Sequence, residues 1–130
     1  NITSTINNYE NINIIYDSVI SIEELNNDFL NSIEFFEPFG NGNPEPQFII
    51  KNLSIHYLKV IKEKHIILHL INNLGNIIKG LCFNCIDNNL GQNLLSSKNK
   101  NLHFACTIQR DSFSKESGIQ IIVKDAVYSK

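Results

Sequence analysis

Basic and aromatic residues recur along the C-terminal two thirds of this chain, and together they could bind a single nucleic-acid strand. Ammonium and guanidinium groups contact phosphates, while aromatic rings stack on unpaired bases. The candidate phosphate contacts are Lys59, Lys62, Lys64, Lys79, Arg110 and Lys124, and the candidate stacking residues are Tyr57, His69, Phe113 and Tyr128. Packing in a core is the competing role for each aromatic residue. Phe113 is the strongest stacking candidate because it lies between two serines in a polar segment, and Arg110 could instead pair with neighbouring Asp111.

The charge of the chain is divided unevenly between its two parts. Residues 1–47 carry eight acidic residues and no lysine or arginine, which gives a net charge of −8. Residues 48–130 carry all eleven basic residues and five acidic ones, which gives +6. Such asymmetry indicates a polyanion-binding module beside an acidic segment. A solvated lysine surface without a partner is the alternative.

The three cysteines include a Cys82-x-x-Cys85 pair, which has the spacing of a metal or redox motif. Zinc would need two further ligands, and no second CxxC completes a familiar site, although Cys106 and several histidines are present. We therefore predict that the cysteines are small buried residues and that this chain has no metal site and no cofactor. The sequence contains no recognisable Ser/His/Asp set, Walker loop or pair of carboxylates, so no catalytic residue is predicted.

A stretch rich in proline and glycine, residues 38–47, divides the chain. Its three prolines fix φ at about −65° and its two glycines permit positive φ, which favours a stiff, non-repetitive connector. Before it, a weak strand signal at 12–16 precedes a helix predicted over Ile22–Phe36, with a capping box formed by Ser21 and Glu24. We expect this N-terminal part to dock on, or to belong to, a neighbouring domain.

After the connector, alternating apolar residues predict five strands. They span Leu53–Ile61, His65–Ile71, Ile77–Phe83, Leu102–Ile108 and Ile119–Val127, with one or two helical turns around Leu90–Leu95. The alternation shifts phase after Tyr57, which indicates a β-bulge or a strong bend, and Asn72–Asn76 is typical of a hairpin turn. Phe83 and Phe104 are assigned to the core. The predicted fold is mainly β, a five-stranded OB-type Greek-key barrel, with an SH3-like barrel or a two-layer α+β sheet as alternatives.

Several classes of protein do not fit the composition. No window approaches the ~20 apolar residues of a membrane span, and no signal-peptide pattern opens the chain, so we expect a cytoplasmic protein with no membrane partner. The sequence contains no methionine. We therefore expect it to be a fragment of a longer protein.

The connector and its flanks resemble a family signature. The bacterial RecJ single-strand-specific exonucleases carry the pattern L-E-P-F-G-x-G-N-P-E-P-x-F, which is similar to residues 36–48, FEPFGNGNPEPQF. Residues 80–83, GLCF, resemble a small-hydrophobic-small-Phe strand of that family. Residues 118–125, GIQIIVKD, resemble its final strand, G-x-x-Q-L-x-V-x-D, with Gln120 one position earlier than in that pattern. The matches span about residues 16–128 in order.

The resemblance implies that residues 1–37 are the tail of a DHHA1 domain, 38–47 the connector, and 48–130 an OB domain that binds single-stranded DNA. In such enzymes a DHH domain holds divalent metal ions, Mg or Mn, that activate water against a phosphodiester. This chain has no Asp-His-His run, so it would hydrolyse nothing alone. The parent would degrade single-stranded DNA from 5′ to 3′ in bacterial repair and recombination. The implied partners are single-stranded DNA, the catalytic domains of the same chain and a single-strand-binding protein.

Two other functions stay open from the sequence. An OB module can brace a catalytic core or dock a partner protein, and RNA binding is not distinguished because stacking and phosphate contacts do not read the 2′ hydroxyl. A continuous cationic groove would favour nucleic acid. Dispersed charge with an exposed apolar patch would favour a protein partner.

Overall fold

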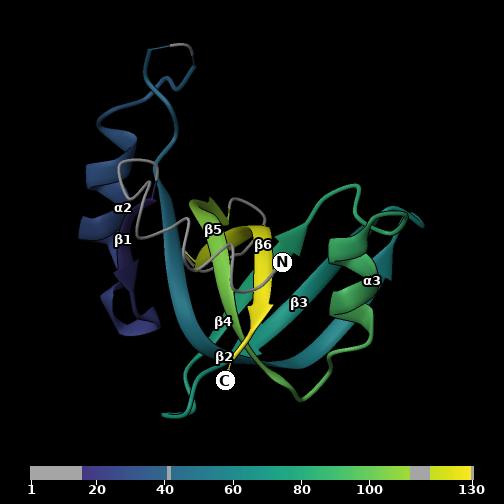
Figure 1. The fold of residues 1–130 in the computed structure, drawn as a ribbon. Helices are drawn as coiled ribbons and strands as arrows, with labels where there is room; N and C mark the ends of the chain where they lie inside the picture. Colours follow the sequence, from purple (N-terminus) through teal and green to yellow (C-terminus); the bar gives the residue numbers. More distant parts are fainter. Residues whose placement is uncertain (1–15, 41, 112–117, 130) are drawn as a thin grey trace.

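A closed five-stranded barrel forms the centre of the molecule (Figure 1). The computed structural model describes residues 16–40, 42–111 and 118–129. The barrel strands are β2 (Gln47–Ile61), β3 (His65–Ile71), β4 (Ile77–Cys82), β5 (Asn101–Asp111) and β6 (Gly118–Tyr128). They pair in the order β2-β3-β4-β6-β5, and β5 returns to β2 and closes the sheet. Only β4 and β6 pair in parallel among them. This arrangement confirms the predicted OB-type barrel.

Strand β2 is long enough to belong to both sides of the barrel. Its first half pairs with β5 and its second half with β3. Its register shifts twice, between Ile50 and Leu53 and between Ile55 and Tyr57, and Asn52 has a positive φ of 61°. The predicted bend is therefore confirmed. The strand begins six residues earlier than predicted, because residues 48–50 are all buried and so show no alternation.

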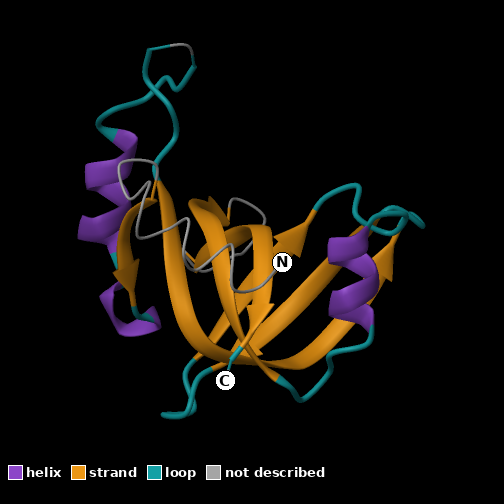
Figure 2. Cartoon of the chain, in the orientation of Figure 1, coloured by secondary structure: helices purple, strands orange, loops and turns teal. Residues whose placement is uncertain are grey.

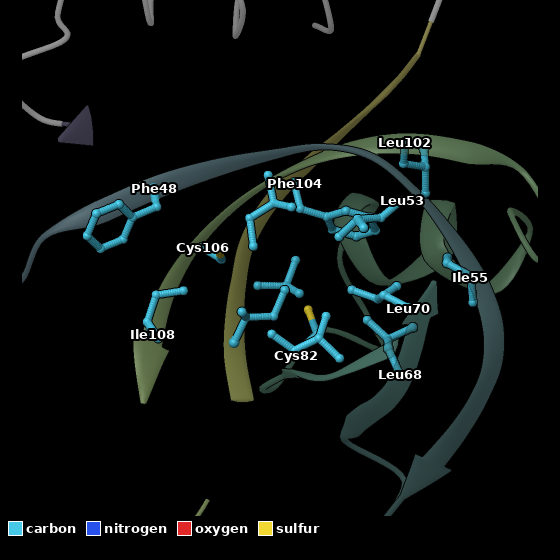
Figure 3. Close-up of a cluster of buried hydrophobic side chains, with 14 of the residues drawn as sticks. Phe48, Leu53, Ile55, Leu68, Leu70, Cys82, Leu102, Phe104, Cys106 and Ile108 are labelled. Atoms are coloured by element: carbon cyan, nitrogen blue, oxygen red, sulfur yellow. The ribbon is translucent and has the colours of Figure 1, made fainter. Parts of the chain in front are cut away.

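Inward-facing residues of all five strands fill the barrel (Figure 3). The alternating positions of β3 and β5 are buried as predicted, and Phe104 is among the fully buried side chains. The prediction for Phe83 is wrong, because its side chain is 50% exposed. Gly80 and Cys82 are buried on the inner face of β4, and a Cβ atom at Gly80 would come into contact with Leu70 and Ile121. Because successive side chains of a strand point to opposite faces, Phe83, which follows inward-facing Cys82, points outward.

The segment before the connector contains two short helices in place of one. A 3-10 turn, η1 (Ile22–Glu24), is followed by α2 (Asn27–Glu34). The Ser21 backbone N–H donates to Glu24 Oε2 at 2.9 Å, as expected for one half of a capping box. Asn26 then starts a new helix, because its side-chain oxygen accepts from the Phe29 N–H at 2.8 Å. A second cap inside the apolar stripe thus breaks the predicted continuous helix.

This segment packs directly on the barrel. Strand β1 (Tyr16–Ile20) adds to β2 in parallel, and Ile20, Leu30 and Ile33 join the same apolar cluster as the barrel strands. The early strand was predicted at residues 12–16, whereas β1 is described from Tyr16 to Ile20. Residues 12–15 lie outside the described residues. Within the described residues, this segment therefore shares its strand pairing and its core with the barrel. The division into three domains stays a prediction.

The second α-helix, α3 (Asn89–Leu95), lies on the side of the barrel away from α2 (Figure 2). It matches the helical turns predicted between the third and fourth barrel strands. The turn between β3 and β4 is also as predicted, with Gly75 at a φ of 87°. Among the residues that the structure describes, no helix is long and apolar enough to cross a membrane.

Candidate nucleic-acid interface

The outer face of β2, β3 and β4 carries a row of three predicted contact residues. The register places Tyr57 of β2 opposite His69 of β3, and His69 opposite Lys79 of β4. The rings of Tyr57 and His69 lie 5.1 Å apart at 39°, and Tyr57 is 42% exposed. Side chains in directly opposed positions on one face of a sheet lie close together. Tyr57 and His69 therefore form one aromatic surface, and the Lys79 cation lies beside it.

A second aromatic pair lies further along the same face. The rings of His65 and Phe83 are 5.4 Å apart and meet edge to face. The Asn84 backbone N–H donates to His65 Nδ1 at 2.9 Å, which fixes the orientation of this imidazole. Phe83 was missed as a candidate contact. Ile78, Gly80 and Cys82 occupy every second position and face inward, so the residue after Cys82 faces outward. This pattern could have identified Phe83 as a surface residue.

Lysines surround these aromatic pairs. Lys59 of β2 is exposed and pairs with Ile67 of β3, between the two aromatic pairs. The tight turn from β2 to β3 carries exposed Lys62 and Lys64, and Lys64 N–H donates to the Ile61 carbonyl at 3.1 Å. Lys124 is exposed on β6, two residues beyond the position that pairs with β4. These four lysines therefore lie on or beside the β2–β4 face.

Two of the predicted cations form ion pairs within the protein. Lys79 Nζ lies 3.3 Å from Asp111 Oδ2, so part of its charge is neutralised. Arg110 contacts α2, where its guanidinium donates to Glu34 Oε1 at 2.9 Å and to the side-chain oxygens of Asn27 and Asn31. The hydrogen bond with Glu34 raises the pKa of Arg110 above its usual value. Arg110 thus binds a helix of its own chain, and its expected alternative partner, Asp111, binds Lys79.

Of the two remaining candidates, the structure places one, Tyr128, away from this face. Tyr128 is half-buried near α3, where its hydroxyl lies 2.8 Å from Ser97 Oγ and Lys100 Nζ lies 5.6 Å from the centre of its ring. Phe113 falls outside the described residues. The structure therefore brings together Tyr57, Lys59, Lys62, Lys64, His69, Lys79 and Lys124 on one side of the barrel.

The cysteines are buried, as predicted. Burial raises the pKa of the Cys82 thiol, and it raises the pKa of Cys106 to about 12. The Cys85 thiol donates to the Cys82 backbone carbonyl at 3.3 Å. Thiols of this kind stay protonated and behave as small apolar residues. Within the described ranges, no group of three or more His, Cys, Asp and Glu side chains could hold a metal ion.

The face suits binding that does not depend on base sequence. Ring faces stack on any base, and ammonium groups contact phosphates wherever they occur along a strand. In OB folds the surface of the second and third barrel strands, with the turn between the first and second, is the usual oligonucleotide-binding region. Here these elements are β3, β4 and the turn that carries Lys62 and Lys64.

Comparisons with known proteins agree with this fold. The family model described as the RecJ OB domain matches residues 16–125. No curated protein matches the chain. Among solved structures, one from the S. pombe Stn1–Ten1 complex is similar, with 15% identity, a TM-score of 0.54, and coverage of 75% of this chain and 68% of that chain. At this identity the likeness shows the fold alone.

Two further solved structures have lower TM-scores. An OBody bound to hen egg-white lysozyme is 8% identical, with a TM-score of 0.49 and coverage of 63% of this chain and 78% of that chain. The aspartyl tRNA synthetase from Entamoeba histolytica is 10% identical, with a TM-score of 0.48 and coverage of 85% of this chain and 24% of that chain.

Proposed function

Because the chain belongs to the RecJ OB domain family, we propose that it is the single-stranded-DNA-binding portion of a RecJ-type exonuclease. The parent would degrade single-stranded DNA from 5′ to 3′ in repair and recombination. This portion would hold the strand, and the DHH and DHHA1 domains of the same parent chain would cut it. A single-strand-binding protein is a further partner of such an enzyme.

One observation carries this proposal. The Tyr57–His69 ring pair lies directly beside Lys59 and Lys79 on the oligonucleotide-binding face of an OB barrel. Stacking a base on an aromatic side chain contributes about 1–3 kcal/mol, and each phosphate contact adds an electrostatic term that salt weakens. The surface therefore combines the two contributions on which sequence-independent strand binding depends.

The divalent metal of such a parent, Mg or Mn, does not fit the residues described here. Among the described residues, no group of three or more His, Cys, Asp and Glu side chains could hold a metal ion. The metal would be held by the catalytic domain of the parent, and the present chain would contribute binding and orientation of the strand. We expect the chain alone to hydrolyse no phosphodiester. An Asp-His-His motif in the parent sequence upstream of Asn1 would test the parentage directly.

Fluorescence anisotropy with a labelled oligothymidylate tests the binding. Tyr57→Ala should weaken binding roughly fivefold or more, since it removes one stacking ring. Lys59→Ala should lower the slope of log affinity against log salt by about 0.7, the value for one phosphate contact on a single strand. Lys51→Ala is the matched control, because Lys51 is exposed on the half of β2 that pairs with β5.

Three outcomes of that titration decide between the alternatives. Negligible affinity at both low and moderate salt contradicts the proposal, and so does an equal loss for Lys59→Ala and Lys51→Ala. Tighter binding of oligouridylate than of oligothymidylate favours an RNA-binding module. The melting temperature of each variant, measured in parallel, separates lost contacts from lost folding.

A further inference from the structure

An apolar groove lies between α2 and the connector, at the start of β2. Its volume is about 690 Å³. The helix contributes Phe29 and Ile33 to its lining, Phe36 follows the helix, and the connector contributes Phe39, Pro44 and Pro46. The groove is remote along β2 from the proposed strand-binding face, which uses the other half of this strand.

The polar groups around this groove bind one another. Asn43 Nδ2 donates to the backbone carbonyls of Phe36 and Pro38, at 2.6 and 2.8 Å. Ser32 Oγ donates to the Phe29 carbonyl at 2.6 Å. Pro44 and Pro46 have no backbone N–H to donate. A ligand therefore gains little from hydrogen bonds to these groups, and the groove suits an apolar side chain.

Two aromatic side chains just after α2 are exposed beside the groove. Phe36 is 61% exposed although it lines the groove, and neighbouring Phe35 is 82% exposed. Their rings lie 5.3 Å apart, edge to face. Single exposed apolar residues are common, but a contiguous apolar patch beside a groove marks an interaction surface.

Acidic residues surround this apolar surface. Glu45 lines the groove, and Glu37 and Glu45 together line an adjoining depression. Residues 1–47 contain no lysine or arginine. The one arginine near α2, Arg110, is paired with Glu34. Among the described residues, the unpaired charges that line the groove and the adjoining depression are therefore those of Glu45 and Glu37, which disfavours an acidic ligand and favours a basic one.

We propose that this groove docks an apolar side chain from a basic segment of a separate partner protein. The apolar anchor fills the space between Phe36 and the prolines, and flanking lysines or arginines of the partner lie against Glu37 and Glu45. A nucleic-acid strand does not fit, because its phosphates would meet the same carboxylates. The proposal stands apart from strand binding, which uses a different surface of the barrel.

Binding of three synthetic peptides to the 130-residue chain tests this proposal. The first carries lysines around a central Leu-Phe pair, the second has glutamates in place of the lysines, and the third has serines in place of Leu-Phe. We expect the first to bind, the second to show no binding, and the third to bind at least roughly tenfold more weakly, because its apolar anchor is missing. The binding of the first should weaken as salt is added.

Variants of the protein then locate the binding. Phe36→Ser should weaken binding of the first peptide roughly tenfold. Glu37→Lys combined with Glu45→Lys should weaken it as well, and this pair alters exposed or half-buried charges only. Leu74→Ser is the matched control, because Leu74 is 73% exposed in the β3–β4 turn, away from the groove. Oligothymidylate binding measured on the same variants should show no loss.

Each contrary result overturns the proposal. Equal binding of all three peptides would show that binding is non-specific. An equal effect of Phe36→Ser and Leu74→Ser on peptide binding would show that the groove is not the binding site. Sedimentation that reveals a dimer lost in Phe36→Ser identifies a second copy as the occupant instead. If Phe36→Ser melts at a lower temperature, the charge-reversal pair decides the question. Failure here leaves strand binding intact, because the two assays use different ligands.

Discussion

Gly91 lies in the first turn of α3, where the helix crosses the turn after β4. A Cβ atom at this position would lie 1.7 Å from the Cys85 carbonyl oxygen and 2.5 Å from its carbon. Both are backbone atoms, so a rotamer change cannot relieve the clash. In the same turn, Asn88 caps the helix, because its side-chain oxygen accepts from the Gly91 N–H at 2.9 Å.

We predict that Gly91→Ala destabilises the protein by about 1–3 kcal/mol, the usual cost of overpacking. The helix must move away from Cys85, and urea unfolding should register the loss as a lower midpoint with an unchanged slope. Gly40→Ala is the matched control, because nothing lies within 4 Å of a Cβ there and no positive φ is involved. Equal midpoints for the two variants would contradict the close packing of α3.

At the scale of elements, Arg110 adds polar contacts to the apolar packing of α2 on the barrel. Arg110 of β5 binds three side chains of the helix, with its shortest contact of 2.9 Å to Glu34. The planar guanidinium can reach three acceptors at once, whereas an ammonium group offers no such fixed fork. The helix buries Leu30 and Ile33 in the core, so its position also governs the groove beside it.

We predict that Arg110→Lys speeds amide hydrogen exchange in α2 and leaves oligothymidylate affinity unchanged. The substitution keeps the positive charge but loses the contacts to Asn27 and Asn31. Exchange measured by mass spectrometry on peptides from α2 and from β3 separates a local from a global effect. Weaker DNA binding with unaltered exchange in α2 would instead assign Arg110 to the phosphate contacts.

At the scale of the whole molecule, the segment before the connector extends the barrel and shares its core. Val19 and Ile20 of β1 pair in parallel with Ile49 and Ile50 of β2. The Phe29 and Phe48 rings lie 5.3 Å apart across the same junction. Removing this segment would uncover the edge of β2 and the apolar residues beneath α2, both of which favour aggregation.

We predict that the chain unfolds in one cooperative transition and that a chain lacking residues 1–46 melts at a lower temperature. Ile20, Leu30 and Ile33 each contribute about 1.5–3 kcal/mol through burial, and all three are lost in the truncation. Calorimetry and circular dichroism of both chains provide the measurement. Two separate transitions in the 130-residue chain, or equal melting temperatures, would support independent domains divided at the connector.

Local patterns in the sequence determined most of the barrel. Alternation of apolar residues located β3 and β5, because a strand with one face in the core repeats every two residues. Turn chemistry located Gly75, and the phase shift near Tyr57 located the bend of β2. The Pro- and Gly-rich signature pointed to RecJ proteins, and the match over residues 16–125 shows the RecJ OB domain family. Each of these signals depends only on residues that are close together along the chain.

Contacts between distant segments were decided only by the tertiary structure. Glu34 and Arg110 are 76 residues apart and meet because α2 packs beside β5, so no local pattern could assign this arginine to the helix. Phe83 points outward because it follows Cys82, the last inward-facing residue of β4, and only the paired strands decide which face is inside. The groove likewise exists only where α2 lies against the connector. Closure of the sheet brings such residues together, and the order of strands around a barrel is not encoded in the period of any one strand.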